Sequence, residues 1–485
     1  MSSIASKSAK GVFWSAVEKF SLQGVQFLIG VVLARLLSPS DFGLIGMLSI
    51  FLSVSQTFVD CGFSNALIRQ KKTTEKDYGT AFLLNFLISL LAFGILFALA
   101  PFVAKFYAMP QLESVMRCVS LTLIINAMFT VHKVRLTRAV NFKMQSKASL
   151  LAALGSGGLG ICLAYNGCGV WSLVFQAICN SVLNLILMTV LLKWFPKPGF
   201  HRKSFDELFG FGSKILAASL IHSVYSNLYN IVIGKRYSAA DLGYFTRADQ
   251  LGKFPSMNVA GIMSRVTLPI LSQLQDDPEK LKNIYEKYLK TTCFVVFPLM
   301  LGLAALAEPV IVLLLGEKWL PSVVLLQILC FGLMLDPICN INLNLLYVKG
   351  RSDLVLRLEV IKKTIAIGIL VVSSFFGIRG MCVGSACYGV IAMLLNTRYT
   401  GLFIGLNTFK QLKRIAPYYL LSLFMASVVF CSVNLISVES RKLLVGIPLG
   451  VILYLGGAFL FKLEALTELM KLLGLKEKLP HWLKF

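Results

Sequence analysis

The sequence predicts an all-α polytopic membrane protein with about fourteen transmembrane helices: two six-helix lobes related by a parallel internal repeat, plus two C-terminal helices. The first observation is composition. Of 485 residues, 56% are hydrophobic and only 14% are charged, whereas soluble domains are closer to a quarter charged. The second is that the apolar residues come in runs of roughly twenty or more, enough to cross a bilayer core as a helix. The third is a pattern that occurs twice.

The repeated pattern is a turn between two apolar runs, which reads ARLLSPSDFGL at Ala34–Leu44 and GKRYSAADLGY at Gly234–Tyr244. A serine followed three residues later by an acid is typical of a helix N-terminus, where both side chains interact with free backbone N–H groups. Each copy alone predicts only a capped helix, and the pair favours an internal duplication. Three identities relate the copies: Ser38 with Ser238, Asp41 with Asp241, and Gly43 with Gly243.

The repeat divides the chain into four predicted regions. They are an N-terminal six-helix lobe at 1–200, a C-terminal six-helix lobe at 201–406, two additional transmembrane helices at 407–464, and a cytoplasmic amphipathic tail at 465–485. Because six spans is an even number, the two lobes would share one orientation and enclose a central cavity. The amphipathic segment Ser272–Lys290 predicts an interfacial helix on the cytoplasmic side.

The basic residues that give the chain its net charge of +24 lie mainly in the predicted loops and termini. Lys and Arg are concentrated in the N-terminus, the even-numbered loops and the C-terminal tail, so both termini are predicted to be cytoplasmic. A basic balance of this kind in a soluble chain would suggest nucleic acid. Here it is a topology signal with a weak attraction to anionic membrane lipid, and no nucleic-acid partner is expected.

Several kinds of chemistry have no motif in the sequence. It contains no G-x-x-x-x-G-K-[ST] for ATP, no metal-ligand spacing among its four His, and no C-x-x-C among its 11 Cys. Gly155, Gly157 and Gly160 spell G-x-G-x-x-G, but they lie inside an apolar helix, where glycines allow helices to approach closely. The chain is therefore not expected to be an enzyme or to need a cofactor or metal.

Polar side chains inside the apolar runs are the main functional signal, because lipid does not tolerate them. The first span carries one polar stripe, and the seventh places His222 on one face with Ser226 and Asn230. Arginine binds phosphate in a bidentate manner, so basic residues facing a cavity suit an anionic head group. Structural pairing, or snorkelling to the membrane surface, explains the same residues equally well. Eight residues are candidates for lining a cavity that binds a substrate with an anionic head group: Lys19, Gln23, Gln26, Lys214, His222, Arg247, Lys253 and Arg265.

Three carboxylates are candidates for ion coupling: Glu18, Asp60 and Asp336. Acids within membrane helices often mark proton or ion relays. Internal salt bridges are the alternative for the first two. Asp336 precedes Pro337, which interrupts the tenth span, so Asp336 has the further alternative of capping a broken helix.

Seven separated segments resemble, in order, the polysaccharide transporter family of the multidrug/oligosaccharidyl-lipid/polysaccharide exporter superfamily, and its colanic-acid-exporter-like branch in particular. They read KGVFWSAVEKFSLQGVQF, LARLLSPSDFGLIGM, QTFVDCGFSNALIR, AYNGCGVWSLV, VIGKRYSAADLGYFTRADQ, GLAALAEPVIVLLLGEKW and INLNLLYVKGRSDL, and the match runs from about Lys10 through Leu406.

The resemblance implies a multi-pass flippase or exporter of the bacterial inner membrane that works by alternating access. The implied cargo is an oligosaccharide on undecaprenyl diphosphate, a repeat unit of lipopolysaccharide, capsule or exopolysaccharide, moved from the cytoplasmic to the periplasmic leaflet. An ion gradient is the expected driving force. Other implied partners are the polymerase and export machinery of the same pathway.

Two alternatives stay open. A multidrug/cation antiporter of the same superfamily would need a cavity dominated by acids, whereas the candidate residues here are mixed and partly basic. A membrane polysaccharide polymerase or glycosyltransferase would need a long extramembrane loop with catalytic acids, and no predicted loop is long enough.

Overall fold

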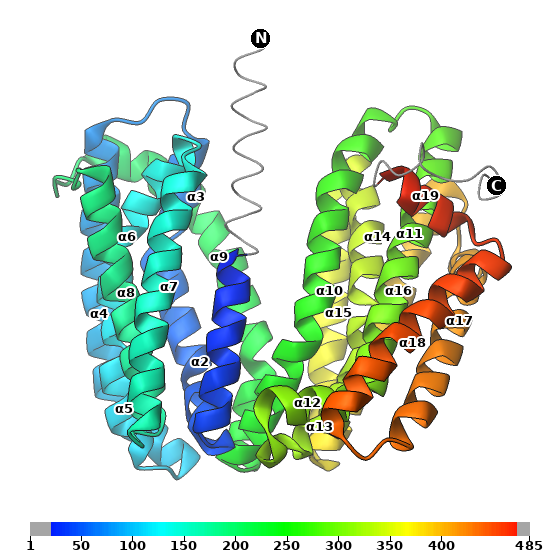
Figure 1. Ribbon diagram of the computed structural model, residues 1–485. Coiled ribbons are helices and arrows are strands. Elements are labelled where there is room, and N and C mark those ends of the chain that lie inside the picture. The colour runs from blue at the N-terminus through cyan, green and yellow to red at the C-terminus, as the bar shows by residue number, and fades with distance from the viewer. Residues whose placement is uncertain (1–20, 473–485) are drawn as a thin grey trace. The chain divides into compact units, whose positions relative to one another are not determined.

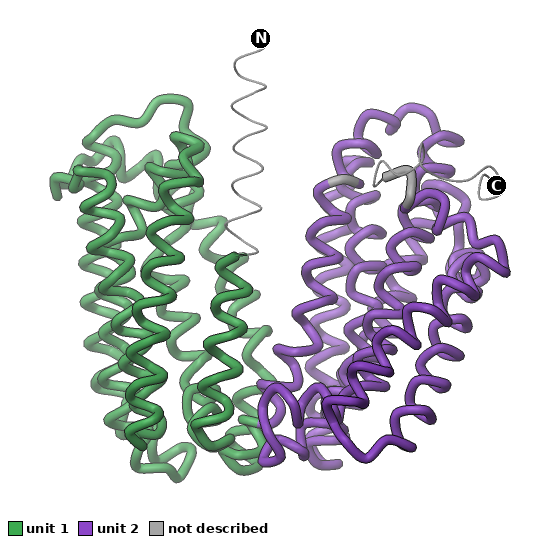
Figure 2. Tube along the Cα trace, viewed as in Figure 1, with its two compact units in different colours: residues 1–243 green, residues 244–485 purple. Residues whose placement is uncertain are grey.

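The structure, a computed structural model, describes residues 21–472. It divides into two units, Met1–Gly243 and Tyr244–Phe485, shown in green and purple in Figure 2. Helices make up both units, as Figure 1 shows, and the predicted all-α fold is confirmed. The lobe limits at residues 200 and 406 stay a prediction.

The main helix contacts in unit 1 are those of α7 with α8, α4 with α6, α6 with α8 and α2 with α9. A helix segment at Ser21–Leu36 precedes these helices. The helices of unit 1 are α2 (Pro39–Asp60), α3 (Phe63–Arg69), α4 (Glu75–Tyr107), α5 (Gln111–Val119), α6 (Leu121–Arg138), α7 (Phe142–Tyr165), α8 (Val170–Leu192), α9 (Arg202–Arg236) and the start of α10 (Ala239–Gln273).

Unit 2 contains the rest of α10 and packs α11 against α17, α13 and α15 against α16, and α17 against α18. Its remaining helices are α11 (Pro278–Ala305), α12 (Ala307–Leu315), the short 3-10 helix η1 (Glu317–Trp319), α13 (Pro321–Leu333), α14 (Asp336–Val348), α15 (Ser352–Ser373), α16 (Gly377–Ile404), α17 (Thr408–Asn434), α18 (Glu439–Leu460) and α19 (Glu464–Leu472).

Within residues 21–472, 11 helices are long and apolar enough to cross a membrane, so the predicted number of fourteen is not confirmed. The first predicted span lies only partly within these residues. The helices α10 and α15 carry several charged residues, such as Arg247 and Lys253 on α10 and Lys362 and Lys363 on α15, which lower their mean hydropathy.

The duplicated turn forms the predicted caps. Ser38 is the N-cap of α2, its Oγ accepts a hydrogen bond from Asp41 N–H at 3.3 Å, and Pro39 is the first helical residue. The second copy repeats this arrangement, since Ser238 Oγ accepts from Asp241 N–H at 3.0 Å. In both copies the aspartate accepts a hydrogen bond from the serine N–H in return. These reciprocal bonds make each turn a capping box.

The two turns also contact each other reciprocally, 200 residues apart in the sequence. A Cβ atom on Gly43 would lie 1.7 Å from the carbonyl oxygen of Ala239, and one on Gly243 would lie 2.0 Å from the carbonyl oxygen of Pro39. Only glycine permits such close backbone approach at these two positions. The contact therefore explains why the glycine, as well as the cap, occurs in both copies.

The sequence predicted an interfacial helix at Ser272–Lys290, and this prediction is wrong. Residues from Pro278 onward belong to α11, which continues without a break to Ala305. The apolar side of the segment, Leu281, Tyr285 and Leu289, is buried in unit 2. Because this side packs against protein, the amphipathic pattern reflects tertiary contact and not a membrane surface.

The predicted amphipathic tail begins with α19, and the residues after Leu472 lie outside the described part of the chain. The helix α19 lies against α11 and forms two ion pairs with it, Lys290–Glu464 at 2.5 Å and Lys287–Glu468 at 3.4 Å. The hydrogen bond from Lys290 lowers the pKa of Glu464 from its usual value. The tail is thus attached to unit 2 by charge.

Candidate functional site

The predicted site residues are divided between the two units. Glu18 and Lys19 lie outside the described residues. Gln23 and Gln26 lie on the helix segment Ser21–Leu36, where Gln26 is exposed and Gln23 is half-buried. The Gln23 Oε1 atom is buried without a hydrogen-bond partner within residues 21–472.

The predicted polar face of α9 is only partly correct. Lys214 and His222 are exposed, and the Ser226 hydroxyl donates to the His222 carbonyl of its own helix at 2.9 Å. Asn230 instead faces α2, where its Nδ2 donates to Ser49 Oγ at 3.0 Å. The structure therefore does not join His222, Ser226 and Asn230 into one site.

A polar seam between α2 and α9 was missed from the sequence. Asn227 lies between Ser49 and Ser53: it accepts from Ser49 Oγ at 2.8 Å and donates to Ser53 Oγ at 3.0 Å. One turn further along, Thr57 and Ser223 are joined by their hydroxyls at 2.8 Å. The spacing of Ser49, Ser53 and Thr57, four residues each time, marks one face of a helix and is the signal that could have revealed the seam.

Asp60 lies at the C-terminal end of α2, in the wall of a cavity of about 500 Å³ within unit 1. Its carboxylate accepts a short hydrogen bond from Ser64 and interacts electrostatically with Lys133 of α6. The cavity is bordered by α2 and α3, by α6, and by α9, which contributes Ser219. Asp60 therefore faces a cavity of mixed polar and apolar lining, and it forms no ion pair under 4 Å with any residue in 21–472.

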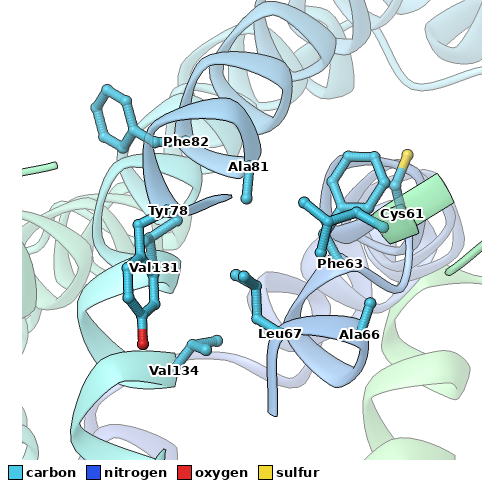
Figure 3. Close-up of a cluster of buried hydrophobic side chains, with 10 residues drawn as sticks. Cys61, Phe63, Ala66, Leu67, Tyr78, Ala81, Phe82, Val131 and Val134 are labelled. Atoms are coloured by element: carbon cyan, nitrogen blue, oxygen red, sulfur yellow. The ribbon is translucent and has the colours of Figure 1, made fainter. Parts of the chain in front are cut away.

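An apolar cluster beside the cavity holds these elements in place (Figure 3). Cys61 and Phe63 lie one and three residues after Asp60, and Val131 and Val134 lie two residues before and one residue after Lys133. The backbone that builds the cluster therefore also positions both charged residues. The figure shows side chains from α3, α4 and α6 beside one another, with the ring of Phe82 pointing away from the rest. The complete cluster is Cys61, Phe63, Ala66, Leu67, Tyr78, Ala81, Phe82, Val131, Val134 and Leu208.

In unit 2, the basic residues of α10 differ in their surroundings. Arg247 is half-buried and donates to Gln250 Oε1 at 2.7 Å. Lys253 forms an ion pair with Asp249, one turn earlier, at 2.7 Å. Arg265 is exposed and forms no ion pair with any residue in 21–472. Both the binding role and the structural role proposed for these residues remain compatible with this arrangement.

Of the two predicted coupling residues within 21–472, Asp336 is the one that lies near a predicted substrate residue. It interacts electrostatically with Lys253 of α10 and with Lys362 and Lys363 of α15. Although Asp336 lies in the first turn of α14, the N-cap is Leu335 and no side-chain cap hydrogen bond is present there. The alternative that Asp336 serves as a helix cap is therefore wrong, while the predicted break before Pro337 is confirmed, because α13 ends at Leu333.

The other members of this charged group were missed from the sequence. Lys362 is only 5% exposed and donates a short hydrogen bond to Glu359, which also lies 4.0 Å from Lys363. Acid and base at i, i+3 and i, i+4 on a helix are the signal that was available. Their packing close to α10 and α14 could not be read from that spacing.

A second buried group of unit 2 is neutral. Asn342 Oδ1 accepts hydrogen bonds from Tyr285 Oη at 2.9 Å and from Thr400 Oγ1 at 2.5 Å. Tyr285 also donates to Gln411 Oε1 at 3.3 Å. These bonds join α11, α14, α16 and α17 and satisfy polar groups that would otherwise be costly to bury. Among residues 21–472, no group of three or more His, Cys, Asp or Glu could hold a metal ion.

Comparison with known proteins places this architecture in a family. The chain belongs to the polysaccharide biosynthesis protein family, whose profile matches residues 32–324, so the family predicted from the sequence is confirmed. The chain is 25% identical to the lipopolysaccharide biosynthesis protein WzxC of Escherichia coli (strain K12) over 401 residues, which are 81% of each chain. It is therefore a multi-pass membrane protein of this family.

Solved structures share the fold at low sequence identity. One is the lipid II flippase MurJ in an inward closed conformation, with a TM-score of 0.75 and 16% identity over 93% of this chain and 98% of that one. Another is an inward-facing multidrug resistance MATE family transporter of the MOP superfamily, with a TM-score of 0.63 and 14% identity over 78% of this chain and 94% of that one. The fold is thus found in transporters of both lipid-linked and drug-like cargo.

Proposed function

We propose that the protein is a flippase that moves an oligosaccharide linked to undecaprenyl diphosphate from the cytoplasmic to the periplasmic leaflet of a bacterial inner membrane. The observation that carries this proposal is the match over 81% of the chain to a relative named for lipopolysaccharide biosynthesis. A fold shared with a lipid II flippase supports it, because lipid II is also a lipid-linked sugar. The mechanism we propose is alternating access.

The basic residues of α10 are our candidates for holding the diphosphate. Arg265 is exposed and able to bind an added anion, and its guanidinium matches phosphate oxygens in a bidentate manner. Arg247, held by Gln250, is placed 18 residues earlier on the same helix, which corresponds to five turns and therefore to the same face. Lys214 of α9 is an exposed cation in unit 1 that suits the same ligand chemistry.

Asp336 is our candidate for ion coupling in unit 2. Its neighbours are the basic Lys253, Lys362 and Lys363 and the acidic Asp249. Lys253 pairs with Asp249 and Lys362 with Glu359, so an ionised Asp336 brings this group of three lysines and three acids close to zero net charge. Adding a proton or a cation at Asp336 makes the group more positive and favours binding of an anionic head group. Asp60 has a different environment, with one lysine and several neutral polar groups around its cavity.

We infer the orientation from the distribution of Lys and Arg, which favours cytoplasmic termini. In this orientation the substrate would be collected where it is assembled, at the inner leaflet. A polymerase and an export complex of the same pathway would then act on the translocated repeat unit.

Reconstitution into proteoliposomes with a labelled undecaprenyl-diphosphate oligosaccharide tests the proposal. The measured quantity is the rate at which label becomes accessible on the opposite leaflet, with and without an imposed ion gradient. Wild type, Arg247→Ala and Arg265→Ala are compared with Arg357→Ala, which removes an exposed arginine of α15. We expect a loss of roughly tenfold or more in each α10 variant and little change in the control.

Each outcome has a distinct meaning. Normal movement in both α10 variants would reject the diphosphate site and leave the flippase standing. No movement by folded wild type under either condition would reject the flippase. Drug efflux in the same vesicles would then favour the multidrug antiporter, whose fold this chain shares.

A further inference from the structure

The cavity beside Asp60 has a volume of about 500 Å³, within the range of roughly 300–1,000 Å³ that ligand pockets occupy. Four of its lining residues carry a carboxylate, an ammonium group or a side-chain amide: Gln56, Asp60, Asn126 and Lys133. They come from α2 and α6, and α9 adds the hydroxyl of Ser219. A set of groups converging from three helices is more than a packing defect, since a void between apolar helices would be lined by apolar atoms.

Within the described part of the chain, one nitrogen and one oxygen of the two amides make no hydrogen bond. Asn126 Nδ2 donates to Gln56 Oε1 at 3.1 Å, which fixes the two side chains against each other. Gln56 Nε2 and Asn126 Oδ1 then have no hydrogen-bond partner within residues 21–472. An orientated pair of this kind presents a donor next to an acceptor, which matches a hydroxyl group that both donates and accepts.

Asp60 and Lys133 add a second such pair. Ser64 occupies one oxygen of the Asp60 carboxylate and leaves the other able to accept. Lys133 is near enough to interact electrostatically with Asp60, yet it forms no ion pair under 4 Å with any residue in 21–472. Among the residues lining this cavity these are the two charged ones, so its net charge is close to zero.

Apolar groups supply the remaining wall. Phe129 of α6 and Ile215 and Leu216 of α9 line the cavity. A pyranose ring has hydroxyls on its rim and C–H groups on its faces, so it needs polar partners around an apolar surface. Lipid tails need no polar partners, and a small cation would not need a cavity of this volume.

We propose that this cavity of unit 1 is a sugar-binding subsite that takes a neutral hexose or N-acetylhexosamine of the transported oligosaccharide. The inference rests on the proposed flippase function and assigns the recognition of the sugar to residues other than those assigned to the diphosphate. Gln56, Asn126, Asp60 and Ser219 bind the hydroxyl groups, and Phe129 contacts a face of the ring. The positive charge of Lys133 balances the negative charge of Asp60, so the cavity has no net charge that would favour a charged sugar over a neutral one.

The test compares two probes for binding to the full-length protein in detergent. One is the lipid-linked oligosaccharide extracted from source cells that lack the transporter, and the other is undecaprenyl diphosphate without sugar. We expect the wild type to bind the sugar-bearing lipid at least tenfold more tightly. The variant Gln56→Leu/Asn126→Leu should lose most of this ratio and should bind undecaprenyl diphosphate as the wild type does, because roughly two hydrogen bonds are removed.

Controls separate a lost subsite from a misfolded protein. Asn180→Leu removes a half-buried amide of α8 in the same unit, away from the cavity, and should keep the wild-type ratio. Ser219→Ala removes one cavity hydroxyl with little risk to the fold and should lower the ratio by a few-fold. Thermal unfolding of each variant checks that it is folded.

Three results would overturn the inference. A wild-type protein that binds both probes equally would have no sugar subsite. A folded double variant that keeps the full ratio would place the subsite elsewhere. A Lys133→Gln variant that loses the ratio completely would mean that the cavity binds an acidic sugar. If the wild type binds neither probe, the flippase proposal itself fails, which is a separate outcome.

Discussion

The helix pair α2 and α9 of unit 1 differs from the helices α10, α14 and α15 of unit 2 in the polar groups that they bring together. In unit 1, α2 and α9 are joined by neutral hydrogen bonds among serine, threonine and asparagine, for example between Ser49 and Asn227. In unit 2, α10, α14 and α15 bring together charged groups, among them Lys253, Asp336 and Lys362. Neutral hydrogen bonds within a membrane protein contribute modestly and can be exchanged for others, whereas a buried charge is costly once its partner is removed.

This difference suggests a division of labour. A neutral polar surface is suited to the hydroxyl groups of a sugar, and a charged group is suited to an anion and to a coupling ion. Three sets of variants, each at a different place in the molecule, are taken from the largest expected effect to the smallest.

The largest effect is expected at the duplicated turn, because it depends on backbone contact. Gly43→Ala and Gly243→Ala would each place a Cβ atom against a carbonyl oxygen, at 1.7 and 2.0 Å in the present geometry. We expect each to destabilise the protein by about 3 kcal/mol or more, since a backbone group cannot rotate away as a side chain can. Thermal unfolding and size-exclusion chromatography measure the loss.

Gly94→Ala is the matched control, because a Cβ at this position in α4 meets nothing within 4 Å. It should be neutral or slightly stabilising. Wild-type stability in both turn variants would mean that the two turns can separate at little cost.

The next effect is expected in the charged group of unit 2. Glu359→Gln would remove the carboxylate that forms an ion pair with Lys362, which is 5% exposed, and leave Asp336 as a carboxylate near it but outside ion-pair distance. We expect a loss of about 3 kcal/mol, the cost of an uncompensated buried charge. The double variant Glu359→Gln/Lys362→Met should recover most of this loss, and thermal unfolding of the two proteins measures the difference.

Asp353→Asn provides a control at an exposed pair of the same helix. Arg351 hydrogen-bonds Asp353 and lowers its pKa to about 2, so the pair stays charged throughout the neutral range. Its removal should change stability little, because solvent screens it. An equal loss of stability in Asp353→Asn and Glu359→Gln would contradict the expectation that a buried ion pair contributes more than an exposed one.

The smallest effect is expected in the neutral seam of unit 1. Asn227→Leu removes the bonds to Ser49 and Ser53, and we expect a loss of about 1 kcal/mol from two interhelical hydrogen bonds. Ser226→Ala, at the adjacent position, removes only bonds within α9 and should be close to neutral. A loss in Asn227→Leu as large as that in Glu359→Gln would remove the distinction between the units.

Local features were predicted well from the sequence. The caps at Ser38 and Ser238 and the break before Pro337 depend on residues within one turn of each other, so short-range chemistry is sufficient to determine them. The all-α membrane fold follows from composition and from the length of the apolar runs. The family was identified from motifs that extend over most of the chain.

Tertiary structure decided which polar residues act together. The sequence placed Asn230 with His222 on one face of α9. Helical periodicity does not determine which neighbouring helix that face contacts. In the structure, Asn230 and Asn227 form hydrogen bonds with Ser49 of α2. The sequence identified Asp60 and Asp336 as acids within predicted membrane helices, but it did not reveal which residues surround them. Gln56, Asn126 and Ser219 surround the cavity of Asp60, and lysines of two other helices surround Asp336, because helices distant in the chain pack side by side.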